Sequence, residues 1–174
     1  MSESLNIPQG SKADIYEALL PQIEAVISAE TDPIANLANT AACLHEAFHF
    51  WWTGFYRVLP KAGMTRANDI DPSATQELVL GPFQGPLACT RIRYGRGVCG
   101  TAWKEARTLI VPDVDQFPGH IACSSASRSE IVVPIFKEAE VIAVLDIDSE
   151  HLATFDEVDQ HYLEQLSALL SARL

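Results

Sequence analysis

The spacing of apolar residues changes near residue 50, and no other feature of the chain constrains the fold as strongly. Before that point, apolar side chains recur three or four positions apart, which predicts helices with one buried face. Residues 50–58 are mostly aromatic or β-branched, which favours a strand. The helical spacing returns near the C-terminus. The sequence therefore predicts N-terminal helices within 1–49, a sheet with its loops within 50–150, and a C-terminal helix over 154–174.

The middle of the chain predicts about six short strands. Segments 130–136 and 141–148 flank a polar turn and should pair as a hairpin. Residues 61–76 predict an exposed hairpin loop, and Pro21 predicts a kink or break in the first helix. At 174 residues the chain has the size of one domain. We expect a single α+β domain over 1–174, with an antiparallel sheet, the terminal helices on one face and a ligand pocket on the other.

Charge and composition narrow the classes of partner. The formal net charge is -11, which disfavours nucleic acid and an anionic membrane surface, since both require a basic face. No apolar run approaches the length of a membrane span, and no targeting segment precedes the first helix. We therefore expect a cytoplasmic protein. In that reducing compartment, cysteines are catalytic, redox-active or metal-bound more often than they are structural disulfides.

Two carboxylates end the last strand. Side chains alternate along a strand, so Asp146 and Asp148 should point to the same side, roughly 7 Å apart. The same alternation places 142 and 144 on that side and 141, 143, 145 and 147 on the other. A solvated strand end is one interpretation. A site for an ammonium group is the other, because paired carboxylates offset the desolvation of a cation.

Three of the four cysteines, Cys89, Cys99 and Cys123, lie within this region. Cys123 lies in a run of small polar residues, with His120 three positions before it, where a core thiol would be out of place. Three thiols permit a relay in which one attacks an electrophile, becomes a sulfenic acid and is resolved by a second as a disulfide. A zinc site made by the three cysteines and His120 is an alternative, although no Cys-x-x-Cys pair occurs. Inert structural thiols are another.

A glycine motif also lies in this region. Residues 95–100 match Gly-x-Gly-x-x-Gly, but the preceding segment alternates between apolar and polar residues instead of being continuously apolar. We therefore interpret the glycines as a tight turn that places Cys99 near the mouth of a pocket.

Trp52 and Tyr56, four apart on a strand, should share a face. Such a pair is usually core, yet with a carboxylate opposite it also holds cationic or thioether-like groups.

The sequence resembles the free methionine-R-sulfoxide reductases, a family built on the GAF domain. The similarity spans nearly the whole chain and is carried by the motifs at 52–56, 78–85, 97–100, 111–114, 117–123, 129–134 and 145–150. The resemblance implies a GAF-like fold and reduction of free methionine-R-sulfoxide. It departs from the family pattern in the long loop at 61–76 and at 51–53.

The resemblance also implies residue roles. Cys123 corresponds to the nucleophile, Cys89 to the usual resolving thiol, and Cys99 to a cysteine that can also enter a disulfide. Glu130 corresponds to a general acid near the sulfoxide oxygen. The substrate's polar end would be bound by Asp146 and Asp148, and its methyl group by Trp52 and Tyr56.

The resemblance also implies partners, and two alternative functions stand beside it. Thioredoxin or a similar dithiol is the expected reductant, no metal or cofactor is expected, and a homodimer through the terminal helices is possible. One alternative class is a GAF sensor that binds a small molecule or responds to redox state without catalysis. Another is a thiol peroxide reductase, which has no need of two aspartates and an aromatic pair.

Overall fold

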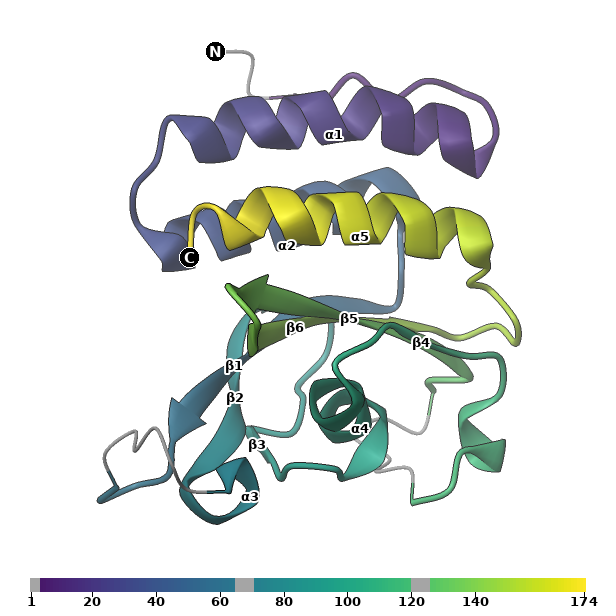
Figure 1. The fold of residues 1–174 in the computed structure, drawn as a ribbon. Helices are drawn as coiled ribbons and strands as arrows, with labels where there is room; N and C mark the ends of the chain where they lie inside the picture. Colours follow the sequence, from purple (N-terminus) through teal and green to yellow (C-terminus); the bar gives the residue numbers. More distant parts are fainter. Residues whose placement is uncertain (1–3, 65–70, 120–125) are drawn as a thin grey trace.

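The chain forms a six-stranded antiparallel sheet in the order β3-β2-β1-β6-β5-β4 (Figure 1). The structure, a computed structural model, describes residues 4–64, 71–119 and 126–174. The strands are β1 Trp52–Pro60, β2 Gln76–Gln84, β3 Arg91–Ile92, β4 Leu109–Val111, β5 Ser129–Lys137 and β6 Glu140–Ser149. The predicted α+β sheet and the hairpin formed by β5 and β6 are confirmed.

Helices cover the two faces of the sheet unequally. On one face α2 (Pro33–Phe48) and α5 (Glu157–Ser171) lie next to the sheet, and α1 (Lys12–Ser28) packs on top of them (Figure 1). On the other face lie α4 (Gly97–Glu105) and irregular loops, while α3 (Pro72–Thr75) and the 3₁₀ turn η1 (Val114–Gln116) are single turns. The terminal helices therefore share one face, as predicted, and the opposite face is left for a pocket.

The helices begin at ordinary capping residues, and two predictions about the helices are wrong. Ser11 and Asp14 form a capping box for α1. The C-terminal helix begins at Glu157, not 154, because Asp156 accepts hydrogen bonds from the backbone N–H groups of Val158 and Asp159 as its N-cap. The predicted break at Pro21 is wrong, since α1 is continuous from Lys12 to Ser28.

Two apolar cores lie on the two faces of the sheet. The helix-side core packs α1, α2 and α5 against inward residues of the strands, among them Phe55 and Leu145. The pocket-side core packs α4 against the opposite residues, among them Trp52, Tyr56 and Val144. Alternation along β1 and β6 thus divides one sheet between two cores.

The predicted alternation fails at the start of β6. Val141 belongs to the pocket-side core and Ile142 packs against the helix-side core, the reverse of the prediction. The β5–β6 pairing shifts between Ile135 and Phe136, where Ile135 pairs with Ala143 but Phe136 pairs with Val141. An extra residue of this kind reverses the faces beyond it. The alternation from residue 143 to residue 148 is as predicted.

No helix within the described residues combines the length and apolar composition needed to cross a lipid bilayer.

Candidate active site

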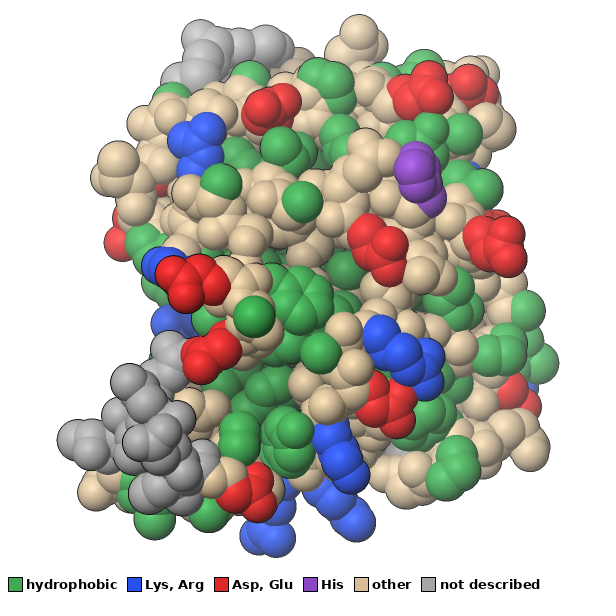
Figure 2. Space-filling model, viewed as in Figure 1, with side chains coloured by type: hydrophobic (Ala, Val, Ile, Leu, Met, Phe, Trp, Pro, Cys, Tyr) green, Lys and Arg blue, Asp and Glu red, His purple; other side chains and the backbone are tan. Residues whose placement is uncertain are grey.

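A pocket on the face opposite the terminal helices contains six of the eight residues predicted for the site. Its walls come from β1, β5, β6, the first turn of α4 and the loop after β2. The six residues are Trp52, Tyr56, Cys99, Glu130, Asp146 and Asp148. Figure 2 shows hydrophobic side chains gathered between β2 and α4 on this side of the sheet. The pocket therefore joins an apolar wall to an acidic one.

Strand register brings the acidic wall together. Trp52 of β1 pairs with Asp148 of β6, which in turn pairs with Glu130 of β5. Asp146 lies two residues earlier on β6, so its side chain projects to the same side as that of Asp148. Three acids from two adjacent strands thus converge on the pocket. The sequence pattern predicted the pair on β6, and the pairing of β5 with β6 adds the third.

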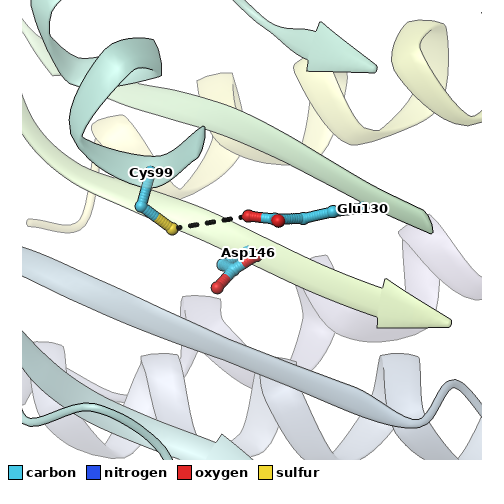
Figure 3. A group of neighbouring side chains, drawn as sticks. All are labelled: Cys99, Glu130 and Asp146. Atoms are coloured by element: carbon cyan, nitrogen blue, oxygen red, sulfur yellow. Dashed lines mark hydrogen bonds between the residues drawn. The ribbon is translucent and has the colours of Figure 1, made fainter. Parts of the chain in front are cut away.

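Cys99, Glu130 and Asp146 form a compact buried cluster (Figure 3). Their side chains come from α4, β5 and β6 and point toward one another. The Cys99 thiol donates to Glu130 Oε1 at 3.9 Å, and one ligating atom of each residue lies within 4.8 Å of the others. Both carboxylic residues are 6% exposed. Such a cluster suits a positively charged ligand.

Burial and mutual repulsion keep these groups protonated more readily than usual. Burial, followed by the charges of Asp146 and Asp148, raises the pKa of Glu130 well above its ordinary value. Burial and Asp148 raise the pKa of Asp146 in the same way. Burial raises the pKa of Asp148 to about 6, against the effect of a hydrogen bond with Ser127. The pKa of the Cys99 thiol also rises, through burial and then the neighbouring carboxylates.

Among the ion pairs of the described residues, none involves Glu130, Asp146 or Asp148. Asp146 Oδ1 is buried without any hydrogen-bond partner. A buried acceptor left unpaired is costly, and such atoms require a particular explanation. An ammonium group or a metal ion bound at Asp146 would supply the missing partner.

The aromatic wall is built by the predicted pair on β1. The rings of Trp52 and Tyr56 lie 6.0 Å apart, and Trp52 also stacks on Phe83 at 5.4 Å. Both polar tips contact the loop that follows β2. Trp52 Nε1 donates to the carbonyl of Pro86 at 3.1 Å, and the Tyr56 hydroxyl donates to the carbonyl of Cys89 at 2.9 Å. Burial raises the pKa of Tyr56 far above its usual value, so the phenol stays neutral.

The cysteines take different positions around this pocket. Cys89 is disulfide-bonded, whereas Cys99 is free. Cys123 and His120 lie outside the described residues. Cys99 does line the pocket, but at 4% exposure it belongs to the buried wall and not to the mouth, because α4 begins at Gly97 and its first turn packs inward.

Two alternatives from the sequence do not fit this geometry. The glycine motif runs into the first turn of α4, but the strand before it is the two-residue edge strand β3 in an antiparallel sheet. The described residues therefore form no βαβ nucleotide site there. The zinc set included Cys89, whose sulfur is already in a disulfide and cannot serve as a thiolate ligand. The described residues bring Cys99 together with two carboxylates instead.

Sequence reasoning missed several residues that line the pocket. Arg96 occupies the N-cap position of α4, without a capping hydrogen bond from its side chain, and lines the pocket. Ser127 hydrogen-bonds with Asp148 and lies in the run of small polar residues that follows Cys123. The hydroxyl groups of that run were a usable sign of a polar pocket wall. Leu87, 90% exposed, also lines the pocket, and no local pattern marked it.

This fold and its pocket define a GAF domain, and residues 54–174 match the GAF domain family. A solved free methionine-R-sulfoxide reductase from Neisseria meningitidis, in complex with its substrate, is 55% identical, with a TM-score of 0.87 over 98% of this chain and 94% of that one. The free methionine-R-sulfoxide reductase of Escherichia coli is 42% identical over 92% of this chain and 88% of its own. GAF domain-containing protein A of Dictyostelium discoideum is 56% identical over 98% and 99%.

The chain belongs to the free methionine-R-sulfoxide reductase family of GAF-domain proteins. The resemblance inferred from the sequence motifs is therefore confirmed.

Proposed function

We propose that this protein reduces free methionine-R-sulfoxide to methionine, with thioredoxin or a similar dithiol as the final reductant. Relatives named free methionine-R-sulfoxide reductase support the proposal, and so does the pocket itself. The observation that carries it is the buried acidic wall facing two aromatic rings, with Asp146 Oδ1 left without a partner. A free amino acid with a short sulfur-containing side chain has the complementary groups.

In the proposed complex, Asp146 and Asp148 bind the substrate ammonium group. The positive charge of that group favours the ionised aspartates and so lowers their raised pKa values on binding. Trp52 and Tyr56 contact the methyl group attached to sulfur, as aromatic faces do with polarisable sulfur groups. A peptide-bound sulfoxide has no free ammonium group, so this arrangement selects the free amino acid.

The chemical step assigns one role to each remaining group. Glu130, whose pKa is well above its ordinary value, retains a proton that it donates to the sulfoxide oxygen. The thiolate of Cys123 attacks the sulfur, the oxygen passes to the cysteine as a sulfenic acid, and methionine leaves. Cys99 is a poor candidate for this attack, because a buried thiol with a raised pKa is protonated.

Resolution of the sulfenic acid is assigned to Cys89. Its thiolate attacks the sulfenic sulfur, an S–S bond forms, the S–OH bond breaks and the hydroxyl leaves as water. The disulfide at Cys89 and the free thiol of Cys99 support Cys89 over Cys99 in this role. A dithiol reductant then exchanges with the disulfide and returns both thiols.

One assay separates the proposal from its alternatives. Reductant consumption coupled to thioredoxin is measured with free methionine-R-sulfoxide, its S epimer, a sulfoxide-containing peptide and hydrogen peroxide. We expect turnover only with the free R epimer. Binding of an amino acid without turnover would favour a sensor, and turnover of peroxide alone would favour a peroxide reductase.

The nucleophile assignment has its own test. Cys123→Ser should abolish turnover, because a serine hydroxyl neither attacks the sulfoxide nor carries its oxygen as a sulfenic acid. Cys43→Ser is the matched control, since Cys43 is a free, half-buried thiol that packs against the helix-side core. Substantial activity in Cys123→Ser would refute the assignment.

A further inference from the structure

The loop that carries Cys89 is held against the pocket by the same two aromatic residues that line it. After β2 the chain turns at Gly85, whose φ is 124°. A Cβ at that position would lie 2.8 Å from Trp52 Cδ1 and 2.8 Å from the carbonyl oxygen of Trp51. Only glycine permits so close an approach. The loop therefore starts in direct contact with the Trp52 ring.

Two side-chain hydrogen bonds then hold the backbone of the loop. Trp52 Nε1 donates to the Pro86 carbonyl at 3.1 Å, and the Tyr56 hydroxyl donates to the Cys89 carbonyl at 2.9 Å. The backbone N–H of Leu80 donates to the Thr90 carbonyl at 3.1 Å, directly after the cysteine. Leu87, between the two side-chain anchors, is 90% exposed, so packing of its side chain does little to hold the loop.

We propose that Trp52 and Tyr56 are positioning residues for Cys89, whose loop they hold against the pocket for its attack on the sulfenic acid. This inference rests on the proposed function, because it assigns the resolving step to Cys89. The rate of disulfide formation depends on the effective concentration of one sulfur at the other. Because both residues are buried on β1, at 4% and 2% exposure, they tie the exposed loop to the interior of the sheet.

The Tyr56 hydroxyl is the sharper target, because it contacts the cysteine residue itself. Tyr56→Phe keeps the ring that lines the pocket and removes only the hydrogen bond to the Cys89 carbonyl. Tyr162→Phe is the matched control, since the Tyr162 hydroxyl donates to Glu17 at 2.9 Å on the helix side of the molecule. Trp52→Phe removes the anchor at Pro86, three residues from the cysteine, and should have a smaller effect.

The experiment mixes the fully reduced protein with one equivalent of free methionine-R-sulfoxide. Methionine formation, sulfenic acid trapped by dimedone and thiol loss are followed in the same reaction. In Tyr56→Phe we expect the ratio of the disulfide-forming rate to the methionine-forming rate to fall about fivefold, as the loss of one neutral hydrogen bond predicts. Trapped sulfenic acid should increase accordingly, and Tyr162→Phe should match the unaltered protein.

An equilibrium measurement gives an independent readout. A fivefold loss of effective concentration raises the reduction potential of the disulfide by about 20 mV. A general loosening of the fold would lower the melting temperature without this selective shift. Equal rate ratios and equal potentials in Tyr56→Phe and the unaltered protein would overturn the inference.

The inference and the proposed function fail in different ways. If the unaltered protein forms no methionine, the proposed function is wrong. Hydrogen peroxide also converts thiols to sulfenic acids, so a parallel reaction with peroxide still compares disulfide formation with dimedone trapping in each variant. In that arm, a larger trapped fraction in Tyr56→Phe supports the positioning role, and an unchanged fraction refutes it.

Discussion

Two buried aspartates on opposite sides of the sheet differ in what surrounds them. Asp159, fully buried among the helices, accepts hydrogen bonds from Lys12, from the Tyr16 hydroxyl at 3.0 Å and from the backbone N–H of Asp156 at 2.9 Å. Asp146, 6% exposed in the pocket, has one oxygen with no partner. The first carboxylate joins α1 to α5. The second lines the pocket, where a cationic ligand would supply the partner that its Oδ1 lacks among the described residues.

The helix side of the sheet therefore stabilises the fold, and the pocket side binds the ligand. A satisfied buried charge stabilises the fold only as long as its partners remain. An unsatisfied buried carboxylate destabilises the free protein and is compensated when a cation binds. Changes on the helix side should therefore alter the free energy of unfolding, and changes on the pocket side should alter turnover or affinity.

The largest expected effect is that of Glu130→Gln on turnover. The amide keeps the shape of the side chain but has no acidic proton, so kcat should fall at least about 100-fold, as loss of a general acid does. The melting temperature should not fall, because a buried, charge-repelled carboxyl is removed. Steady-state kinetics and thermal unfolding measure both, with the exposed Glu164→Gln on α5 as control. A kcat within threefold of the unaltered value would contradict the assignment.

Lys12→Met tests the opposite side of the comparison. It leaves the fully buried Asp159 without its cationic partner, so the free energy of unfolding should fall by about 2 kcal/mol. The kcat and KM should stay within about twofold, because Lys12 contacts only the helix side. Urea unfolding with parallel kinetics measures this. Lys61→Met, which removes an amine that donates to the Ser73 carbonyl in α3, is the control. A loss of activity without a loss of stability would contradict this division of roles between the two sides of the sheet.

The sequence was most informative where a single strand decides the geometry. Period-two alternation alone places Asp146 and Asp148 on one face, and likewise Trp52 and Tyr56. It fails at Val141, because the bulge opposite Phe136 depends on the pairing of two strands and leaves no local mark.

The parts of the pocket that the sequence could not predict come from packing between distant elements. The burial of Cys99 and its raised pKa arise only because α4 packs on β5 and β6. The last helix was predicted to start at 154 and not at Glu157, because Thr154 and Asp156 are both residue types that cap helices. Thr154 instead donates to Ser149 Oγ at 2.7 Å, a choice set by tertiary contacts.

Asp146→Asn should weaken substrate binding more than it slows the chemical step. An amide cannot neutralise the ammonium group, so KM should rise about tenfold while kcat stays within about threefold. The free energy of unfolding should not decrease, since the substitution replaces a buried carboxyl group whose ionisation is disfavoured by burial and by Asp148. Kinetics over a range of substrate concentrations separates the two constants, with the exposed Asp115→Asn of η1 as control. A tenfold fall in kcat with an unchanged KM would show that Asp146 acts on the transition state instead.

The smallest expected effect concerns pH and Asp148. Its pKa is raised from 3.8 to about 6, so between these values the folded protein binds more protons than the unfolded chain. The free energy of unfolding contributed by this group is therefore greatest below pH 3.8 and decreases as the pH rises toward 6. In Asp148→Asn, without substrate, the decrease across this range should be smaller by on the order of 1 kcal/mol. Urea unfolding at pH 4, 5 and 6 measures the difference, and parallel curves for the two proteins would show that Asp148 is not held in a charge-unfavourable site.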